Sequence, residues 1–207
     1  MSTELYTQFL TIATLHLFAV MSPGPDFALI IRQSLCYDRK VSIMTSIGIG
    51  FGILFHIFFC VIGLGIIISK STYLFNIIKV SGGLYLIFLG YKSLSKKMPI
   101  NPIDSSDDAP KNINAFSIGL LTNLLNPKAT LFFLSLYTFI INEQPIIRIQ
   151  VFYGIWMSII TALWFCFLSI ILTNKFIIKR IKIFLHIIQN ITGIMLIIIG
   201  IRLIFFN

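Results

Sequence analysis

The sequence predicts an all-α, polytopic membrane protein. Of its 207 residues, 57% are hydrophobic and only 11% are charged, and the mean hydropathy is +0.95. A soluble domain carries about 25% charged residues. The apolar residues also form runs long enough to cross a hydrocarbon core about 30 Å thick, which takes about 20 helical residues. At this length, a single transmembrane domain is expected.

Six apolar runs are long enough for transmembrane helices. They lie near residues 5–31, 41–68, 73–94, 113–141, 148–173 and 183–206. Only SKSTY separates the second run from the third, so a tight turn is expected there. The polar segment 95–112 contains three prolines and no apolar periodicity, which is typical of a flexible linker. This predicted cytoplasmic linker divides the domain into two three-helix halves, residues 1–94 and 113–207.

The positions of Lys and Arg predict the orientation. Eleven of the sixteen basic residues lie in, or at the edge of, the links after the first, third and fifth runs, and the positive-inside rule places such links in the cytoplasm. Both termini are therefore expected on the outer side of the cytoplasmic membrane, opposite the cytoplasm. The same positions account for the net charge of +9, so no nucleic-acid partner is expected. The eleven residues are Arg32, Arg39, Lys40, Lys92, Lys96, Lys97, Lys111, Lys175, Lys179, Arg180 and Lys182.

An alignment of the third run with the sixth indicates an internal repeat. SGGLYLIFLGYKSL (81–94) lies over ITGIMLIIIGIRLI (191–204) without gaps. The first and fourth runs also correspond, with Pro25 over Pro127. Each half has an odd number of spans, so the second half would be inverted, as in many secondary transporters. The alignment of the third and sixth runs pairs Gly83 with Gly193, Gly90 with Gly200, and Lys92 with Arg202.

The first run is interrupted by SPGPDF at residues 22–27. Pro23 and Pro25 flank Gly24, and each proline removes a backbone donor, so the helix is expected to unwind or kink. Freed carbonyl groups must face protein or a water-filled cavity rather than lipid. Asp26 follows, and a carboxylate deep in a span costs about 2.5–3.5 kcal/mol. A charge partner, a cation or a proton must offset that cost; a purely structural ion pair is the alternative.

The fourth run contains a second break, NLLNPKATLFF at residues 123–133. Pro127 precedes Lys128, which is far from either end of the run and is expected to face the interior rather than the membrane surface. Asn126 adds a polar group. Asp26 suits the ammonium group of a zwitterion and Lys128 suits its carboxylate, with helix ends adding partial charges. The two side chains can equally neutralise each other.

His56 is the remaining candidate in the site. Gly48, Gly52 and His56 are spaced four apart, so they share one helix face, and the two glycines permit close helix packing. A histidine there can relay protons near neutral pH; a satisfied interior histidine is an equal alternative. His16 and His186 are weaker candidates.

Signals for other chemistry are missing from the sequence. Cys36, Cys60 and Cys166 have no metal-ligand spacing and are interpreted as packing residues. There is no HExxH, GxSxG, GxGxxG or P-loop, so no enzymatic activity, cofactor or metal site is expected.

Four segments, SPGPDF, GIGFGILFH, SGGLYLIFLGYKSL and NPKATLFF, together resemble the LysE/RhtB family of bacterial amino-acid exporters. The resemblance covers most of the chain. It implies an inner-membrane carrier that expels amino acids or close derivatives, driven by the membrane potential or the proton gradient. The family motif positions fall on Pro23, Gly24, Pro25, Asp26, Asn126, Pro127 and Lys128.

The favoured interpretation is a secondary exporter whose amino-acid substrate binds between the two breaks. A cation or metal-ion transporter on the same scaffold is the first alternative, with Asp26 and either His56 or Asn126 as ligands. A non-transporting membrane protein, such as an intramembrane enzyme, is the second. Membrane lipid is the other expected partner. The sequence leaves open a homo-oligomer, the identity of the amino acid and the coupling ion.

Overall fold

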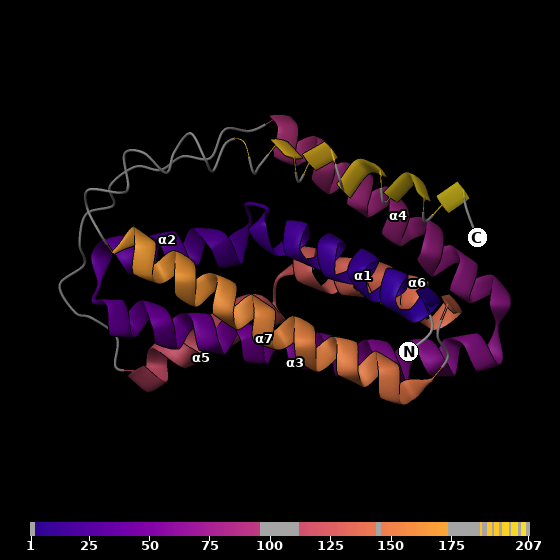
Figure 1. The fold of residues 1–207 in the computed structure, drawn as a ribbon, viewed down its shortest axis with the longest axis horizontal. Helices are drawn as coiled ribbons and strands as arrows, with labels where there is room; N and C mark the ends of the chain where they lie inside the picture. Colours follow the sequence, from indigo (N-terminus) through magenta and orange to yellow (C-terminus); the bar gives the residue numbers. More distant parts are fainter. Residues whose placement is uncertain are drawn as a thin grey trace.

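The computed structural model describes residues 3–95, 112–143 and 146–173, with a further set of residues between 187 and 205. Every regular element in these parts is an α-helix (Figure 1), which confirms the all-α class. The helices are α1 (Thr3–Met21), α2 (Pro25–Cys36), α3 (Arg39–Lys70), α4 (Thr72–Ser95), α5 (Asn112–Leu124), α6 (Pro127–Glu143) and α7 (Ile147–Leu172). The further described residues, which are helical as well, are 187, 190, 191, 193, 194, 196–198, 200–202, 204 and 205.

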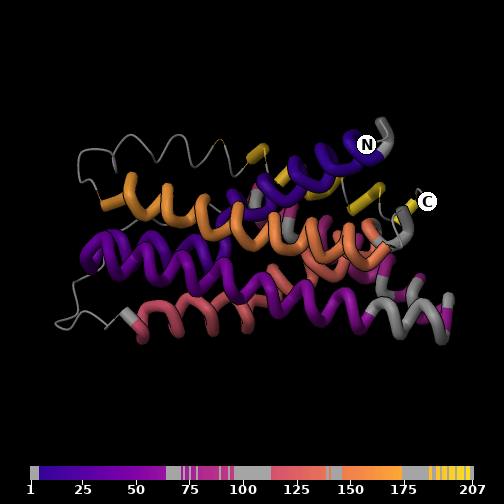
Figure 2. The backbone as a smooth tube through the Cα atoms, turned by 60° about the horizontal axis from the view of Figure 1, so that its bottom comes forward, coloured from indigo at the N-terminus to yellow at the C-terminus, as the bar shows by residue number. Residues whose placement is uncertain are grey.

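The helices run roughly along one long axis, with α3 in contact with both α5 and α7 (Figure 2). The start of α1 and the last described residues of the chain lie at the same end of the bundle in Figures 1 and 2. Only Ser71 separates α3 from α4, which confirms the predicted tight turn.

Two of the six predicted spans meet the length and composition of a membrane-crossing segment among the described residues, namely Arg39–Gly63 and Ile147–Leu172. Leu5–Met21 and Pro25–Cys36 meet them together, as a third span if the bent pair is one span. The third predicted span coincides with α4, and the fourth with α5 followed by α6. The sixth span and the linker lie largely outside the described residues. The count of six therefore stays a prediction.

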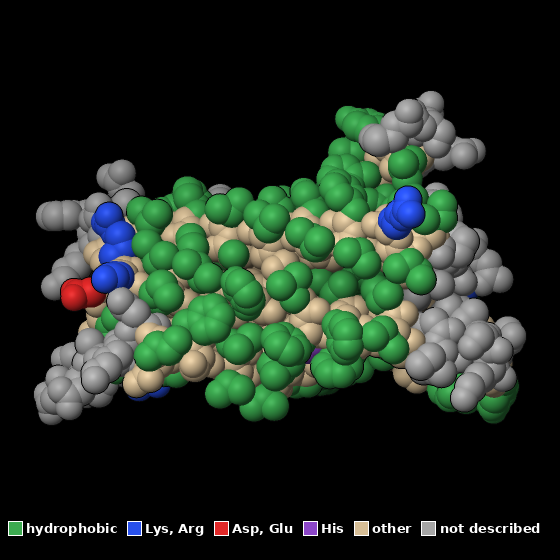
Figure 3. Space-filling view, turned by 90° about the horizontal axis from the view of Figure 1, so that it is seen from below, with side chains coloured by type: hydrophobic (Ala, Val, Ile, Leu, Met, Phe, Trp, Pro, Cys, Tyr) green, Lys and Arg blue, Asp and Glu red, His purple; other side chains and the backbone are tan. Residues whose placement is uncertain are grey.

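The outer surface fits a lipid environment. Figure 3 shows hydrophobic side chains covering the middle of one face, with Lys and Arg side chains toward its two ends. A patch this extensive is avoided on soluble monomers, whereas a membrane helix bundle presents such a surface to lipid. The large exposed apolar side chains include Phe51, Phe55, Phe58 and Phe59 of α3 and Phe152, Ile155, Ile159 and Leu163 of α7.

Serine side chains link three helices inside the bundle. Ser42 Oγ of α3 donates to Ser169 Oγ of α7 at 2.7 Å, and Ser34 Oγ of α2 lies 2.7 Å from Ser42 Oγ. Ser46 Oγ is 3.0 Å from Ser169 Oγ. All four are buried. Because interhelical hydrogen bonds contribute to association in membranes, this serine cluster ties α2 to the α3–α7 pair.

Glycines bring α3 and α5 into backbone contact. A Cβ atom added to Gly48 would lie 2.1 Å from the backbone oxygen of Phe116, and one added to Gly119 would lie 2.1 Å from that of Thr45. A Cβ on Gly52 would lie 2.8 Å from Cβ of Asn123. The predicted close packing through Gly48 and Gly52 is confirmed, and it fixes α3 against the end of α5 that carries Asn123.

A second set of glycines pairs α4 with the helical residues after 187. A Cβ on Gly83 would lie 2.8 Å from the oxygen of Gly200, and one on Gly200 would lie 2.5 Å from that of Gly83. Gly90 and Gly193 meet in the same mutual way, at 2.5 and 2.9 Å. The sequence alignment pairs Gly83 with Gly193 and Gly90 with Gly200. Replacing each glycine by its aligned partner therefore turns the Gly83–Gly200 contact into the Gly193–Gly90 contact. Halves related by a two-fold axis are expected to make this pattern; the repeat itself stays a prediction.

Candidate functional site

The first helix break separates α1 from α2. Pro25 lies at the start of α2, where its missing N–H would have no partner in the helix in any case. Gly24 is extended, with φ −175° and ψ −171°, and the two helix axes differ by 54°. The predicted unwinding at Pro23–Pro25 is confirmed. It leaves Asp26 in the first turn of α2, where the helix dipole favours a negative charge.

The second break, between α5 and α6, has the same construction. Pro127 begins α6, and the residue before it, Asn126, caps the helix because its Oδ1 accepts a hydrogen bond from the backbone N–H of Lys128 at 3.0 Å. Lys128 therefore lies in the first turn of α6, where the helix dipole disfavours a cation. Its ammonium group needs compensation from elsewhere.

That compensation comes from the first break. Lys128 Nζ donates to the carbonyl oxygen of Ser22 at 2.7 Å and to that of Pro23 at 3.3 Å. These carbonyls lie just beyond the C-terminal end of α1, where the helix dipole favours a positive charge. The lysine side chain passes over Gly24, since a Cβ there would lie 3.0 Å from Lys128 Cδ.

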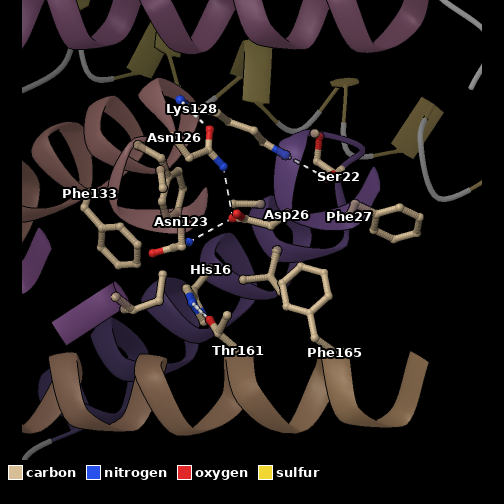
Figure 4. Close-up of a pocket in the computed structure, with 16 residues that line it drawn as sticks. His16, Ser22, Asp26, Phe27, Asn123, Asn126, Lys128, Phe133, Thr161 and Phe165 are labelled. Atoms are coloured by element: carbon tan, nitrogen blue, oxygen red, sulfur yellow. Dashed lines mark hydrogen bonds between the residues drawn. The ribbon is translucent and has the colours of Figure 1, made fainter. Parts of the chain in front are cut away.

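The second break in turn holds Asp26. Asn123 Nδ2 donates to Asp26 Oδ2 at 2.8 Å, and Asn126 Nδ2 donates to the same oxygen at 2.9 Å (Figure 4). Each break thus supplies partners for the charged residue of the other. Amide and carbonyl groups hold Asp26 and Lys128, in place of the direct neutralisation that the sequence left open.

A cavity of about 40 Å³ lies between the two breaks. Such a volume exceeds the roughly 10–15 Å³ that one water needs, so the space between the breaks can hold more than one water molecule. The wall includes residues from α1, α2, α3, α5, α6 and α7. Its polar and aromatic residues are His16, Ser22, Asp26, Phe27, Asn123, Asn126, Lys128, Phe132, Phe133, Thr161 and Phe165.

Two acceptor atoms beside the cavity have unmet hydrogen-bonding capacity. Asp26 Oδ1 and Asn123 Oδ1 are buried and have no partner. A buried unpaired polar atom costs about 1–3 kcal/mol, and more when charged. Two free acceptors, one of which is a carboxylate oxygen, are suited to an ammonium group.

His56 lies behind this wall. Its Nε2 is 3.0 Å from the backbone oxygen of Asn123, and its ring stacks on Phe133, with centroids 5.9 Å apart and planes 6° apart. A carbonyl only accepts, so Nε2 carries a proton and donates it in this bond. This contact positions the end of α5 and fits the satisfied interior histidine; the relay role stays a prediction.

The structure adds two residues that sequence reasoning ranked low or missed. His16, a weaker candidate in the sequence, lines the cavity with its ring 3.1 Å from Thr161 Oγ1. Thr161 was not singled out, because a lone threonine in an apolar helix is indistinguishable from a packing residue without the fold. His186 lies outside the described residues.

The alternative of a metal or cation site finds no assembled ligand set. Among the described residues, no group of three His, Cys, Asp or Glu side chains lies close enough to hold a metal ion. Asn126, one of the predicted ligands, turns its NH₂ group toward Asp26, and His56 points Nε2 at a backbone carbonyl. Both side chains are already engaged in other contacts.

Known proteins match most of the chain. The family described as LysE type translocator matches residues 17–206. The chain is 36% identical over 162 residues to a threonine efflux protein of Escherichia coli strain K12, which covers 76% of this chain and 78% of that protein. It is similar to an uncharacterized membrane protein of Bacillus subtilis strain 168, YrhP, with 33% identity over 88% of this chain and 91% of that one. No solved structure matches.

Proposed function

The chain belongs to the LysE family of translocators, and on that premise we propose that it exports an amino acid or a close derivative across the bacterial cytoplasmic membrane. Membership makes it a membrane transporter and not an enzyme. Because 76% of the chain aligns with a relative named for threonine efflux, threonine and other small amino acids are the first substrates to test.

The observation that carries this proposal is the crossed pair of charges at the two breaks. Lys128 holds an ammonium group against the first break, and Asp26 holds a carboxylate against the second. A zwitterion has both complementary charges. Its carboxylate can replace the carbonyl oxygen of Ser22 as the acceptor for Lys128. Its ammonium group can bind the free Oδ1 atoms of Asp26 and Asn123.

Such an exchange of partners connects binding to movement. When the substrate carboxylate binds Lys128, the hydrogen bond that joins α6 to the first break is lost. When the ammonium group draws Asp26 away, the bonds from α2 to Asn123 and Asn126 weaken. The two bent segments are then free to shift, which provides alternating access to a site between inverted halves.

Energy coupling and orientation complete the proposal. Export proceeds against a gradient at the expense of the proton gradient or the membrane potential, with Asp26 as the group that can carry a proton. The basic links face the cytoplasm and both termini lie outside. Substrate and lipid are the proposed partners, and the state of association is left to experiment.

An efflux assay tests the proposal. Cells loaded with dipeptides and expressing Asp26→Asn or Lys128→Met are expected to release amino acid at least tenfold more slowly than cells with the native protein. The matched controls are Asp38→Asn and Lys40→Met, which alter exposed charges at the start of α3 and are expected to keep native rates. Native efflux from both site variants, at equal abundance in the membrane, would exclude these residues from transport. The cation transporter would be favoured if the native protein made cells tolerant of metal ions, if Asp26→Asn abolished that tolerance, and if no amino acid were released.

A further inference from the structure

His16 and Thr161 form part of the cavity wall away from Lys128. His16 is on α1 and Thr161 on α7, and both side chains are buried, with 0% and 1% of their surface exposed. Nε2 of His16 lies 3.1 Å from Oγ1 of Thr161. In Figure 4 this pair lies on the other side of Asp26 from Lys128 and Asn126. The aromatic rings of Phe132, Phe133 and Phe165 also line the cavity.

The pair has hydrogen-bonding capacity that the fold does not use. Nδ1 of His16 is buried without a partner. If Nε2–H donates to Thr161, Nδ1 is a free acceptor and the threonine hydroxyl is still able to donate. If the threonine hydroxyl donates to Nε2, Nδ1–H is a free donor and the threonine oxygen still accepts. In both tautomers one donor and one acceptor remain, one at Nδ1 and the other at the threonine hydroxyl on the opposite side of the ring, and a ligand hydroxyl, which can donate or accept, can bond to either.

The charges around the cavity limit what the rest of the ligand can be. Among the described lining residues there is one carboxylate, Asp26, and one ammonium group, Lys128. An α-amino acid uses both with its own ammonium and carboxylate groups. A charged substrate side chain would then lie unpaired beside aromatic rings, which is unfavourable away from water. The cavity of about 40 Å³ also gives a short side chain more room than a long one.

We propose that His16 and Thr161 are specificity-determining residues that bind the substrate side chain and select a short, neutral side chain bearing a hydroxyl. This inference rests on the proposed amino-acid export, and it assigns the side-chain end of the same site. It predicts discrimination between two amino acids of equal shape, because a site arranged to bind a hydroxyl leaves its own polar atoms unpaired when the hydroxyl is missing.

Threonine and valine are such a pair, since they differ in shape very little and only threonine has the hydroxyl. The purified full chain in liposomes is loaded with threonine, valine or lysine, and the rate of release of each is measured. For the native protein, threonine is expected to leave at least tenfold faster than either of the other two. In Thr161→Val and in His16→Phe, the threonine-to-valine ratio is expected to fall about tenfold.

The matched control is Thr138→Val. Thr138 is a fully buried threonine of α6 whose hydroxyl donates to the Leu134 carbonyl of its own helix at 2.7 Å. It does not line the cavity, so its replacement is expected to keep the native threonine-to-valine ratio. A ratio rather than a rate is compared, because a purely structural effect lowers both rates together.

Three results would overturn the assignment while leaving export intact. These are equal release of threonine and valine by the native protein, release of lysine as fast as threonine, and a native ratio in both site variants. If the native protein releases none of a wider panel of amino acids from the liposomes, amino-acid export itself fails, and the assignment of His16 and Thr161 fails with it.

Discussion

Asp26 and Lys128 each depend on groups from the other half of the chain. The two residues are separated by about a hundred positions in the sequence, yet Asn123 and Asn126 bind Asp26, and the carbonyl of Ser22 binds Lys128. Neutral partners of this kind stabilise a charge without cancelling it. A substrate with opposite charges can therefore still be attracted to both residues, which a direct ion pair would oppose.

Asn126 has two separable tasks, and a single substitution distinguishes them. Its Oδ1 caps α6, and its Nδ2 donates to Asp26. Asn126→Asp retains the cap but removes the donor and adds a like charge next to Asp26. We expect the variant to reach the membrane in native amounts and to release amino acid at least tenfold more slowly in the efflux assay.

The control for this substitution is Asn76→Asp, which makes the same chemical change at an exposed position of α4. It is expected to export at the native rate. Equal export by Asn126→Asp and Asn76→Asp would show that the contact between Asn126 and Asp26 has no part in transport.

At the scale of the helices, a proline at the first helical position followed by a charged residue occurs twice. Both α2 and α6 begin with proline, and Asp26 and Lys128 follow directly. Both charges thus lie at positive helix ends. The acid is favoured there and the base is disfavoured, so Lys128 is held less firmly by its own helix than Asp26 is. The lysine is therefore the residue expected to exchange partners first when substrate carboxylate arrives.

The position of α5 depends on how closely α3 approaches it. Gly48→Leu would place a side chain where the backbone oxygen of Phe116 lies, 2.1 Å from the first added atom. Overpacking of a core costs about 1–3 kcal/mol, and here the clash is with rigid backbone. We expect less folded protein in the membrane and a lower melting temperature of the purified protein in detergent.

Gly63→Leu is the matched control on the same helix. Among the described residues, and apart from its own helix backbone, no atom lies within 4 Å of a Cβ added at Gly63, so this variant is expected to have the melting temperature of the native protein. If the two leucine variants have the same melting temperature, helix propensity rather than the α3–α5 contact determines the change in stability.

For the whole molecule, we propose two inverted halves, residues 1–94 and 113–207, joined by the cytoplasmic linker 95–112. The mutual glycine contacts support this arrangement: Gly83 with Gly200 and Gly90 with Gly193 exchange under the sequence alignment. The side chains near them follow the same rule. A Cβ on Gly83 would meet Ile204, and one on the aligned Gly193 would meet the aligned Leu94.

The inversion predicts a definite topology, which reporter fusions measure. Alkaline phosphatase is expected to be active when fused after residue 207 and inactive when fused within the linker, and a fluorescent protein that folds only in the cytoplasm is expected to show the reverse. The physical reason is that three crossings separate the linker from each terminus. If the linker and the C-terminus report the same side, the second half crosses an even number of times and cannot be the inverse of the first.

Several features of this protein could be derived from the sequence because they depend on local chemistry. The apolar runs predict the all-α membrane class, since backbone in lipid must satisfy its own hydrogen bonds. The prolines at 23, 25 and 127 predict the helix breaks because a proline interrupts a helix regardless of its neighbours. Asp26 and Lys128 stand out because charge in an apolar run is costly.

What only the tertiary structure decided is which groups meet. The hydrogen bonds from Asn123 and Asn126 to Asp26, and from Lys128 to Ser22, join segments far apart in the chain, and no local pattern encodes such distances. His16 and Thr161 are ordinary helix residues until α1 and α7 place them on one cavity wall. The free-energy cost of a buried charge or of a proline break can be inferred from the sequence of its own helix. A binding site lies in the space between helices, and their packing determines that space.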